Sequence, residues 1–141
     1  MESENIFSIL KRIPFFADLS ELKHAKMVKN ISMRSCPAGY TFFKEGDDTT
    51  KSPFFIILKG MVNIFRKNSV GENHCLATLK NNDFFGEMGI LTNEARNATA
   101  QAAEDCHVLE IPNADFLNLI QSCPNMAAKI SETYINREKG K

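Results

Sequence analysis

The hydrophobic period of the chain changes at about Ile31, and this change limits the fold more than any other feature of the sequence. From there to Ile111, short β-favouring runs alternate with clusters of turn-forming residues at intervals of roughly ten residues. The runs cover residues 40–43, 54–58, 61–66, 74–79, 98–102 and 106–111. This rhythm is typical of a β-sandwich or a β-barrel, so we expect a mainly β protein.

One of these runs is apolar at every position. Residues 54–58 read Phe-Phe-Ile-Ile-Leu, whereas a strand with one face in water alternates apolar and polar side chains. We therefore expect this strand to lie in the centre of the fold, with both of its faces covered.

Helical periodicity flanks the β region on both sides. Residues 6–13 and 21–29 carry apolar side chains at helical spacing before it, and residues 116–120 and 126–134 do so after it. Pro124 suits the first turn of the last segment. We expect two short helices before the strands and two after them.

Composition excludes several classes of function. The chain has 141 residues, the length of one ordinary domain, and its Lys+Arg and Asp+Glu counts are both 17, which leaves no basic excess for nucleic acid. The longest purely apolar run, residues 54–58, is far too short to span a bilayer, and the acidic opening, residues 1–4, is unlike a secretory signal. We expect one cytoplasmic domain spanning residues 1–141, with neither a nucleic-acid partner nor a membrane partner.

Metal sites and catalytic groups are not recognisable. The four cysteines are scattered without a Cys-x-x-Cys pair, so we expect reduced, structural thiols. A cupin-like metalloenzyme is an alternative that such a barrel allows, but His24, His74 and His107 are isolated and form no His-x-His pair. No nucleophile and base pair stands out, so we expect no metal and no enzyme activity.

The segment from residue 84 to residue 100 carries the chemistry that the sequence does show. It fits a short helix between two strands, whose first turn would offer free N–H groups and the positive end of a dipole to an anion. Gly86 and Gly89 let the backbone approach a ligand closely. Arg96 supplies a charged planar fork suited to a phosphodiester, and Glu87 supplies a carboxylate that accepts from a sugar hydroxyl. A lone Arg or Glu is most often a solvated surface charge, but both together at this spacing favour a ligand site.

This segment resembles a known motif. Phe85-Gly86-Glu87, eight intervening residues and then Arg96-Asn97-Ala98-Thr99 are similar to the phosphate-binding cassette of cyclic-nucleotide-binding domains, as in protein kinase A regulatory subunits and Crp-type bacterial regulators. The similarity runs in order along residues 12–135, through residues 13–16, Gly39, Gly46-Asp47, residues 54–57 before Gly60, and residues 106–111.

The resemblance implies an eight-stranded β jelly-roll barrel with N-terminal helices and two C-terminal helices. It implies that the ligand is cAMP or cGMP, with no further cofactor, and that Glu87 meets the ribose 2′-hydroxyl while Arg96 meets the cyclic phosphate. The implied ligand-binding residues are Phe85, Gly86, Glu87, Met88, Gly89, Arg96, Asn97 and Ala98, with Ile64, Leu76 and Leu79 against the base.

The same resemblance implies a sensor that moves its C-terminal helices when the nucleotide binds. No helix-turn-helix, kinase or channel pattern is present, so we expect the output to pass to an unidentified effector protein. Asn97 stands where the family usually has Ala, Ser or Thr, so the choice between cAMP and cGMP stays open. Met126, Ile130 and Tyr134 fit either a helix face packed on the barrel or the seam of a homodimer. An interaction module that keeps this fold but has lost its ligand is the main alternative.

Overall fold

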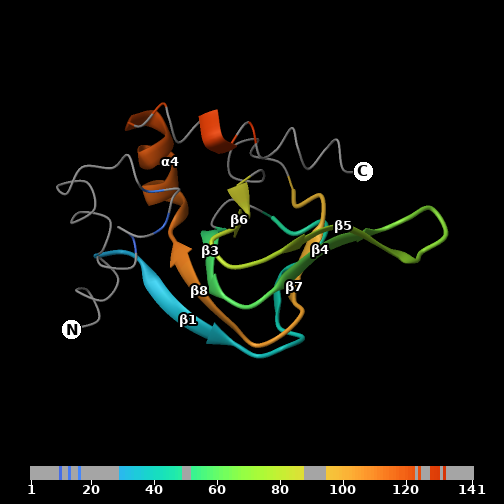
Figure 1. Cartoon of the computed structure of the whole chain (residues 1–141). Helices are drawn as coiled ribbons and strands as arrows, with labels where there is room; N and C mark the ends of the chain where they lie inside the picture. Colours follow the sequence, from blue (N-terminus) through green and yellow to red (C-terminus); the bar gives the residue numbers. More distant parts are fainter. Residues whose placement is uncertain are drawn as a thin grey trace.

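Eight strands form two four-stranded antiparallel sheets in the computed structural model of the chain (Figure 1). The structure describes residues 10, 13, 16, 29–48, 52–87, 95–122, 124, 128–130 and 132. The first sheet has the order β1-β8-β3-β6 and the second has the order β2-β7-β4-β5. The elements are β1 (Ser32–Cys36), β2 (Thr41–Phe43), β3 (Phe54–Lys59), β4 (Val62–Lys67), β5 (Asn73–Leu79), β6 (Phe84–Phe85), β7 (Thr99–Ala102), β8 (Cys106–Ile111) and α4 (Asn113–Ser122).

The expected mainly β architecture of eight strands is confirmed, and six of the strands lie in the predicted runs. Periodicity alone missed β1 and β6. In β1 only Cys36 is buried, because the strand lies at the edge of the first sheet and its other side chains meet solvent. In β6 the two residues Phe84 and Phe85 pair with Ile56 and Phe55 of β3, and two residues are too few to show a period.

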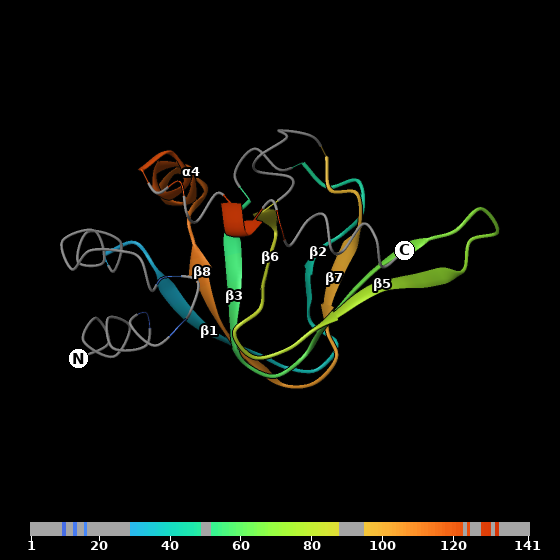
Figure 2. The same ribbon diagram turned by 45° about the horizontal axis from the view of Figure 1, so that its top comes forward.

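The first sheet is the middle layer of the protein and has a hydrophobic core on each face. Phe54, Ile56 and Phe84 belong to the core that the sheet shares with α4, where the rings of Phe54 and Phe116 stack at 4.2 Å. The neighbouring positions 55, 57 and 85 belong to the core between the two sheets. The prediction that residues 54–58 form a central strand covered on both faces is therefore confirmed. Figure 2 shows α4 beside the first sheet, on the side away from the second sheet.

The helix predicted after the β region is present as α4. It begins directly after Pro112, whose carbonyl accepts the first helical hydrogen bond from Phe116 N–H at 3.0 Å. Of the helix expected from Pro124 onward, residues 124, 128–130 and 132 are described and are helical. Of the two predicted N-terminal helices, only residues 10, 13 and 29 are described, and residue 29 lies in a turn. Residues 10 and 13, together with residue 16 between the two segments, are buried in the core beside α4. Among the described residues, no helix is both long enough and apolar enough to cross a bilayer.

Candidate anion-binding site

The backbone turns sharply at Gly86, directly after β6. Gly86 has φ of +91°, a conformation that a side chain strains. A Cβ atom there would lie 3.2 Å from the carbonyl oxygen of Pro53 and 3.6 Å from Nη2 of Arg96. Glycine at this position therefore permits the turn and also keeps the space beside the Arg96 guanidinium free.

Arg96 reaches this turn from the other sheet, just before β7, and its side chain is buried with 4% exposure. Its Nη1 donates to the carbonyl oxygen of Gly86 at 2.8 Å. Its Nε and Nη2 are also buried, and neither has a hydrogen-bond partner among the residues that the structure describes. These two nitrogens lie on the same edge of the guanidinium, the edge that donates two parallel hydrogen bonds to a carboxylate or a phosphate. The side chain thus presents an unused two-donor fork inside the protein.

The main chain of Arg96 is tied to the turn that follows β2. Arg96 N–H donates to the carbonyl oxygen of Asp47 at 2.8 Å, and Gly46 N–H donates to the carbonyl oxygen of Arg96 at 2.6 Å. Because both bonds join backbone to backbone, they hold the main chain of Arg96 in place without a ligand. The turn-forming residues 45–48 predict a turn here, but nothing in the sequence predicted its pairing with Arg96.

Phe43, in β2, lies against the guanidinium and is a neighbour that the sequence did not predict. The Cζ atom of Arg96 is 3.9 Å from the centroid of the Phe43 ring, well inside the range of a cation–π contact. The Phe43 ring in turn lies 6.1 Å from that of Phe85. No local signal in residues 40–43 distinguishes this ring from an ordinary core side chain.

The electrostatic setting keeps the fork positive at neutral pH. Burial lowers the pKa of Arg96 to about 10, while the nearby charges of Glu87 and Asp47 act in the opposite direction. Glu87 is itself only 2% exposed, so a carboxylate and a guanidinium are both buried at this end of the fold. A buried cation with two unused donors favours an anion with two oxygen atoms.

The other predicted site residues occupy several environments. Phe85 and Ala98 are buried, while Asn97 is exposed. Glu87 is helical, and the short helix predicted after it lies outside the described residues together with Met88 and Gly89. Among the base-contact candidates, Ile64 and Leu79 join the core between the sheets, whereas Leu76 is half-buried beside the irregularity that follows Ile64 and is not a described member of that core.

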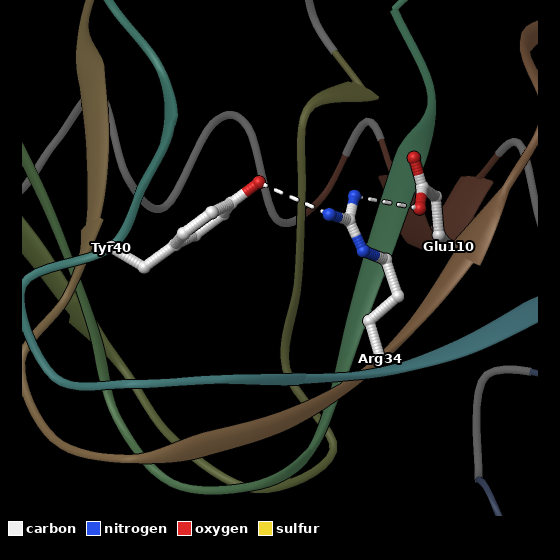
Figure 3. A network of polar contacts seen from close by, with 3 residues as sticks. All are labelled: Arg34, Tyr40 and Glu110. Carbon is white, nitrogen blue, oxygen red and sulfur yellow. Dashed lines mark hydrogen bonds and ion pairs between the residues drawn. The ribbon is translucent and has the colours of Figure 1, made fainter.

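A second arginine makes a different set of contacts at the edge of the same fold. Figure 3 shows Arg34 of β1 lying between Tyr40 and Glu110. Its Nη1 donates to a carboxylate oxygen of Glu110 at 3.1 Å and its Nη2 donates to the Tyr40 hydroxyl at 3.3 Å. This network joins β1 and β8 of the first sheet to the start of β2 in the second.

A metal centre finds no support in the described part of the chain. There, no three His, Cys, Asp or Glu side chains gather closely enough to hold an ion. His74 lies on β5 of the second sheet and His107 on β8 of the first, while His24 is outside the described residues.

The fold and the arrangement of Gly86 and Arg96 define a class of protein, and the comparison of sequences agrees with them. Residues 33–123 match the family described as "Cyclic nucleotide-binding domain". The chain belongs to this family.

Relatives of known description are found among bacterial regulators and kinase regulatory subunits. The "Cyclic AMP receptor protein" of Thermus thermophilus is 29% identical over 91% of this chain and 58% of its own length. Among solved structures, "cAMP bound PfPKA-R (141-441)" superposes with a TM-score of 0.70 and 26% identity, over 83% of this chain and 41% of that one. A protein kinase A regulatory subunit from Trypanosoma cruzi, described as cAMP-independent and bound to guanosine, has a TM-score of 0.80 at 19% identity, over 98% of this chain and 50% of that one. The chain therefore spans little more than half of these proteins, or less.

Proposed function

We propose that the chain is a non-catalytic sensor module that binds a cyclic nucleotide, cAMP or cGMP, and signals to an effector protein. In this proposal residues 1–141 make one cytoplasmic domain, Arg96 binds the cyclic phosphate and Glu87 accepts from the ribose 2′-hydroxyl. One observation supports the proposal most directly, namely the buried Arg96 fork whose Nε and Nη2 have no hydrogen-bond partner in the described part of the chain. A cyclic phosphodiester has two free oxygen atoms and one negative charge, which match that fork in number and in sign.

The remaining candidates would complete the cradle around the ligand. Backbone groups of Gly86, Met88 and Gly89 would face the phosphate, and residues 85, 97 and 98 would frame it. The side chains proposed to contact the base are Ile64, Leu76 and Leu79. Exposed Asn97 carries an amide that can pair with a phosphate or with a purine, so it is the residue through which cAMP and cGMP would differ.

The proposed response is a change in the C-terminal helices. Phe84 and Phe85 are neighbours in β6, so a movement of β6 toward the ligand acts on both cores at once. In the core beside α4, the ring of Phe84 lies 5.6 Å from that of Phe54, which stacks on Phe116 of α4. A nucleotide shifts α4 only if it binds the shifted state more tightly than the resting one.

The test is calorimetric titration of the protein with cAMP, cGMP and guanosine. We expect saturable binding of at least one cyclic nucleotide, and no comparable binding of guanosine because it has no phosphate for Arg96. A hundredfold excess over the dissociation constant should also raise the free energy of unfolding by about 2.7 kcal/mol.

Two results would contradict the proposal in different ways. Equal binding of guanosine and cAMP would show a nucleoside site in which the arginine fork is not used. Silence with all three compounds would favour the alternative of an interaction module that has kept the fold and lost the ligand.

A further inference from the structure

The contact between Phe43 and Arg96 fixes the orientation of the guanidinium plane, which the hydrogen bond of the group does not fix. In the described part of the chain the guanidinium makes one hydrogen bond, from Nη1 to the carbonyl oxygen of Gly86, and one bond does not set the plane of the group. The Phe43 ring, 3.9 Å from Cζ, covers one face of the group and sets that plane. The ring does so without using Nε or Nη2, since an aromatic face accepts no conventional hydrogen bond.

The backbone holds ring and fork in one unit. Phe43 ends β2, and the turn that follows is bonded to the main chain of Arg96 through Gly46 N–H and the carbonyl oxygen of Asp47. Both ends of the Phe43–Arg96 contact are therefore anchored close to the contact itself. An arginine side chain loses rotamer entropy when it binds an anion. Because Phe43 already restricts the Arg96 side chain in the folded protein, less entropy is lost when the anion binds.

We infer that Phe43 is a positioning residue for Arg96, which sets the plane of the guanidinium before an anion arrives and so raises the affinity for a cyclic phosphate. The inference rests on the proposed function, because the anion in question is the nucleotide. It assigns to β2 a part in the site that the glycine and arginine motif of residues 85–99 does not contain.

Phe42 provides the matched control within the same strand. Both phenylalanines are half-buried and both contact the Phe85 ring, Phe42 at 5.0 Å and Phe43 at 6.1 Å. Among the described residues, however, the ring of Phe42 lies under no guanidinium, and its aromatic contacts are the rings of Tyr40, Phe55 and Phe85. Shortening either side chain disturbs the core similarly, but only Phe43 should affect the fork.

The experiment compares cAMP and cGMP titrations of the wild type with those of Phe43→Leu, Phe43→Tyr and Phe42→Leu. We expect about tenfold weaker binding for Phe43→Leu, and affinities within about twofold of the wild type for the other two variants. Thermal melting without ligand shows whether each variant is folded. If Phe43→Leu does not fold, Phe43→Met takes its place.

A second measurement needs no ligand. In a proton–nitrogen-15 correlation spectrum, the Nε–H proton of Arg96 should be shifted upfield by the Phe43 ring in the wild type and in Phe42→Leu. The shift should disappear in a folded Phe43→Leu or Phe43→Met variant. A merely structural phenylalanine would not produce this pattern.

The outcomes separate the two claims. Wild-type binding together with unchanged affinity in Phe43→Leu, or equal losses in Phe42→Leu and Phe43→Leu, would overturn the inference and leave the proposed function intact. A wild-type protein that binds neither nucleotide would overturn the proposed function and, with it, the role of Phe43 toward the nucleotide. The absence of an upfield Arg96 signal in the wild type would overturn the stacking on which the inference depends, whatever the variants do.

Discussion

Two arginines contact the aromatic residues at the two ends of residues 40–43, and they differ in burial and in hydrogen-bond partners. Arg34 lies 5.8 Å from the ring of Tyr40, is largely open to water and has a carboxylate and a hydroxyl as partners. Arg96 lies 3.9 Å from the ring of Phe43, is buried, and its guanidinium has one hydrogen-bond partner among the described residues, the carbonyl oxygen of Gly86. The hydrogen bond to Glu110 raises the pKa of Arg34, whereas burial lowers that of Arg96.

The difference separates an arginine that is paired on the surface from one that is buried with unused donors and that we propose to bind a ligand. Arg34 finds its counter-charge within the chain and closes an edge of the fold. Arg96 is desolvated with donors to spare, which costs stability unless another molecule supplies the acceptor. Stability and binding should therefore respond to the two residues in opposite ways.

The largest expected effect comes from replacing each arginine by methionine and titrating cAMP. Arg96→Met should bind about 100- to 10,000-fold more weakly, because two hydrogen bonds to a charged group are lost, each worth about 1.5–3 kcal/mol. Arg34→Met should bind within about twofold of the wild type. A loss below tenfold for Arg96→Met, with the variant folded, would remove Arg96 as the anchor.

The substitution Gly86→Ala adds a methyl group beside Nη2 of Arg96 and so tests whether a ligand occupies that space. Gly86→Ala should lower the free energy of unfolding by about 2 kcal/mol, through the positive φ and the close approach to Pro53, and should also weaken cAMP binding. Gly71→Ala is the matched control, since Gly71 has φ of +82° but nothing lies within 4 Å of an added Cβ.

Gly71→Ala should cost about 1 kcal/mol and leave affinity unchanged. Equal effects of the two substitutions on cAMP binding, measured by calorimetry, would show that the space beside Nη2 is not used.

The pH dependence of cAMP binding tests the lowered pKa of Arg96. Affinity should be level from pH 7 to pH 9 and fall about tenfold by pH 11, as the guanidinium loses its proton near pH 10. Folding disfavours the charged form of Arg96, so this group costs stability below pH 10, and the cost disappears as the pH rises toward 12.5.

Deprotonation of Arg96 therefore does not unfold the protein, and unfolding through this group does not explain the loss of cAMP affinity at high pH. Circular dichroism at each pH checks that the protein is folded. cAMP is the suitable ligand, because neither its base nor its phosphodiester titrates in this range. Constant affinity up to pH 11 would mean that the side chain is not desolvated in solution.

The smallest effect concerns the ligand-free protein. Arg34→Met should lower the free energy of unfolding by about 0.5 kcal/mol, as for a surface ion pair. Arg96→Met should leave it unchanged or raise it by up to about 1 kcal/mol, because a buried, partly unpaired charge is replaced by an apolar side chain. Urea denaturation measures both, and the contrast fails if Arg96→Met is the more destabilised variant.

The sequence predicted the strands of the fold and the closeness of Gly86 to Arg96, but not the side chains that surround Arg96. The strand at residues 106–111 and the two-faced strand at residues 54–58 were predictable because apolar runs and turn residues act locally. The proximity of Gly86 to Arg96 followed from a motif within one segment. The contact of Arg96 with Phe43 and the network of Arg34 were not predictable, since each joins residues that only the tertiary fold brings together, and single charged or aromatic residues carry no mark of their partner.

Phe84 and Phe85 of β6 point to opposite faces of the first sheet, so neighbouring residues serve different cores. Even-numbered positions of β3 and β6 face the helical layer, and odd-numbered positions face the layer that contains the arginine fork. The core beside α4 and the core beside the arginine fork are therefore formed by interleaved but separate sets of residues. An engineer could therefore repack the face toward α4 at positions 54, 56 and 84 without changing a side chain that faces the second sheet.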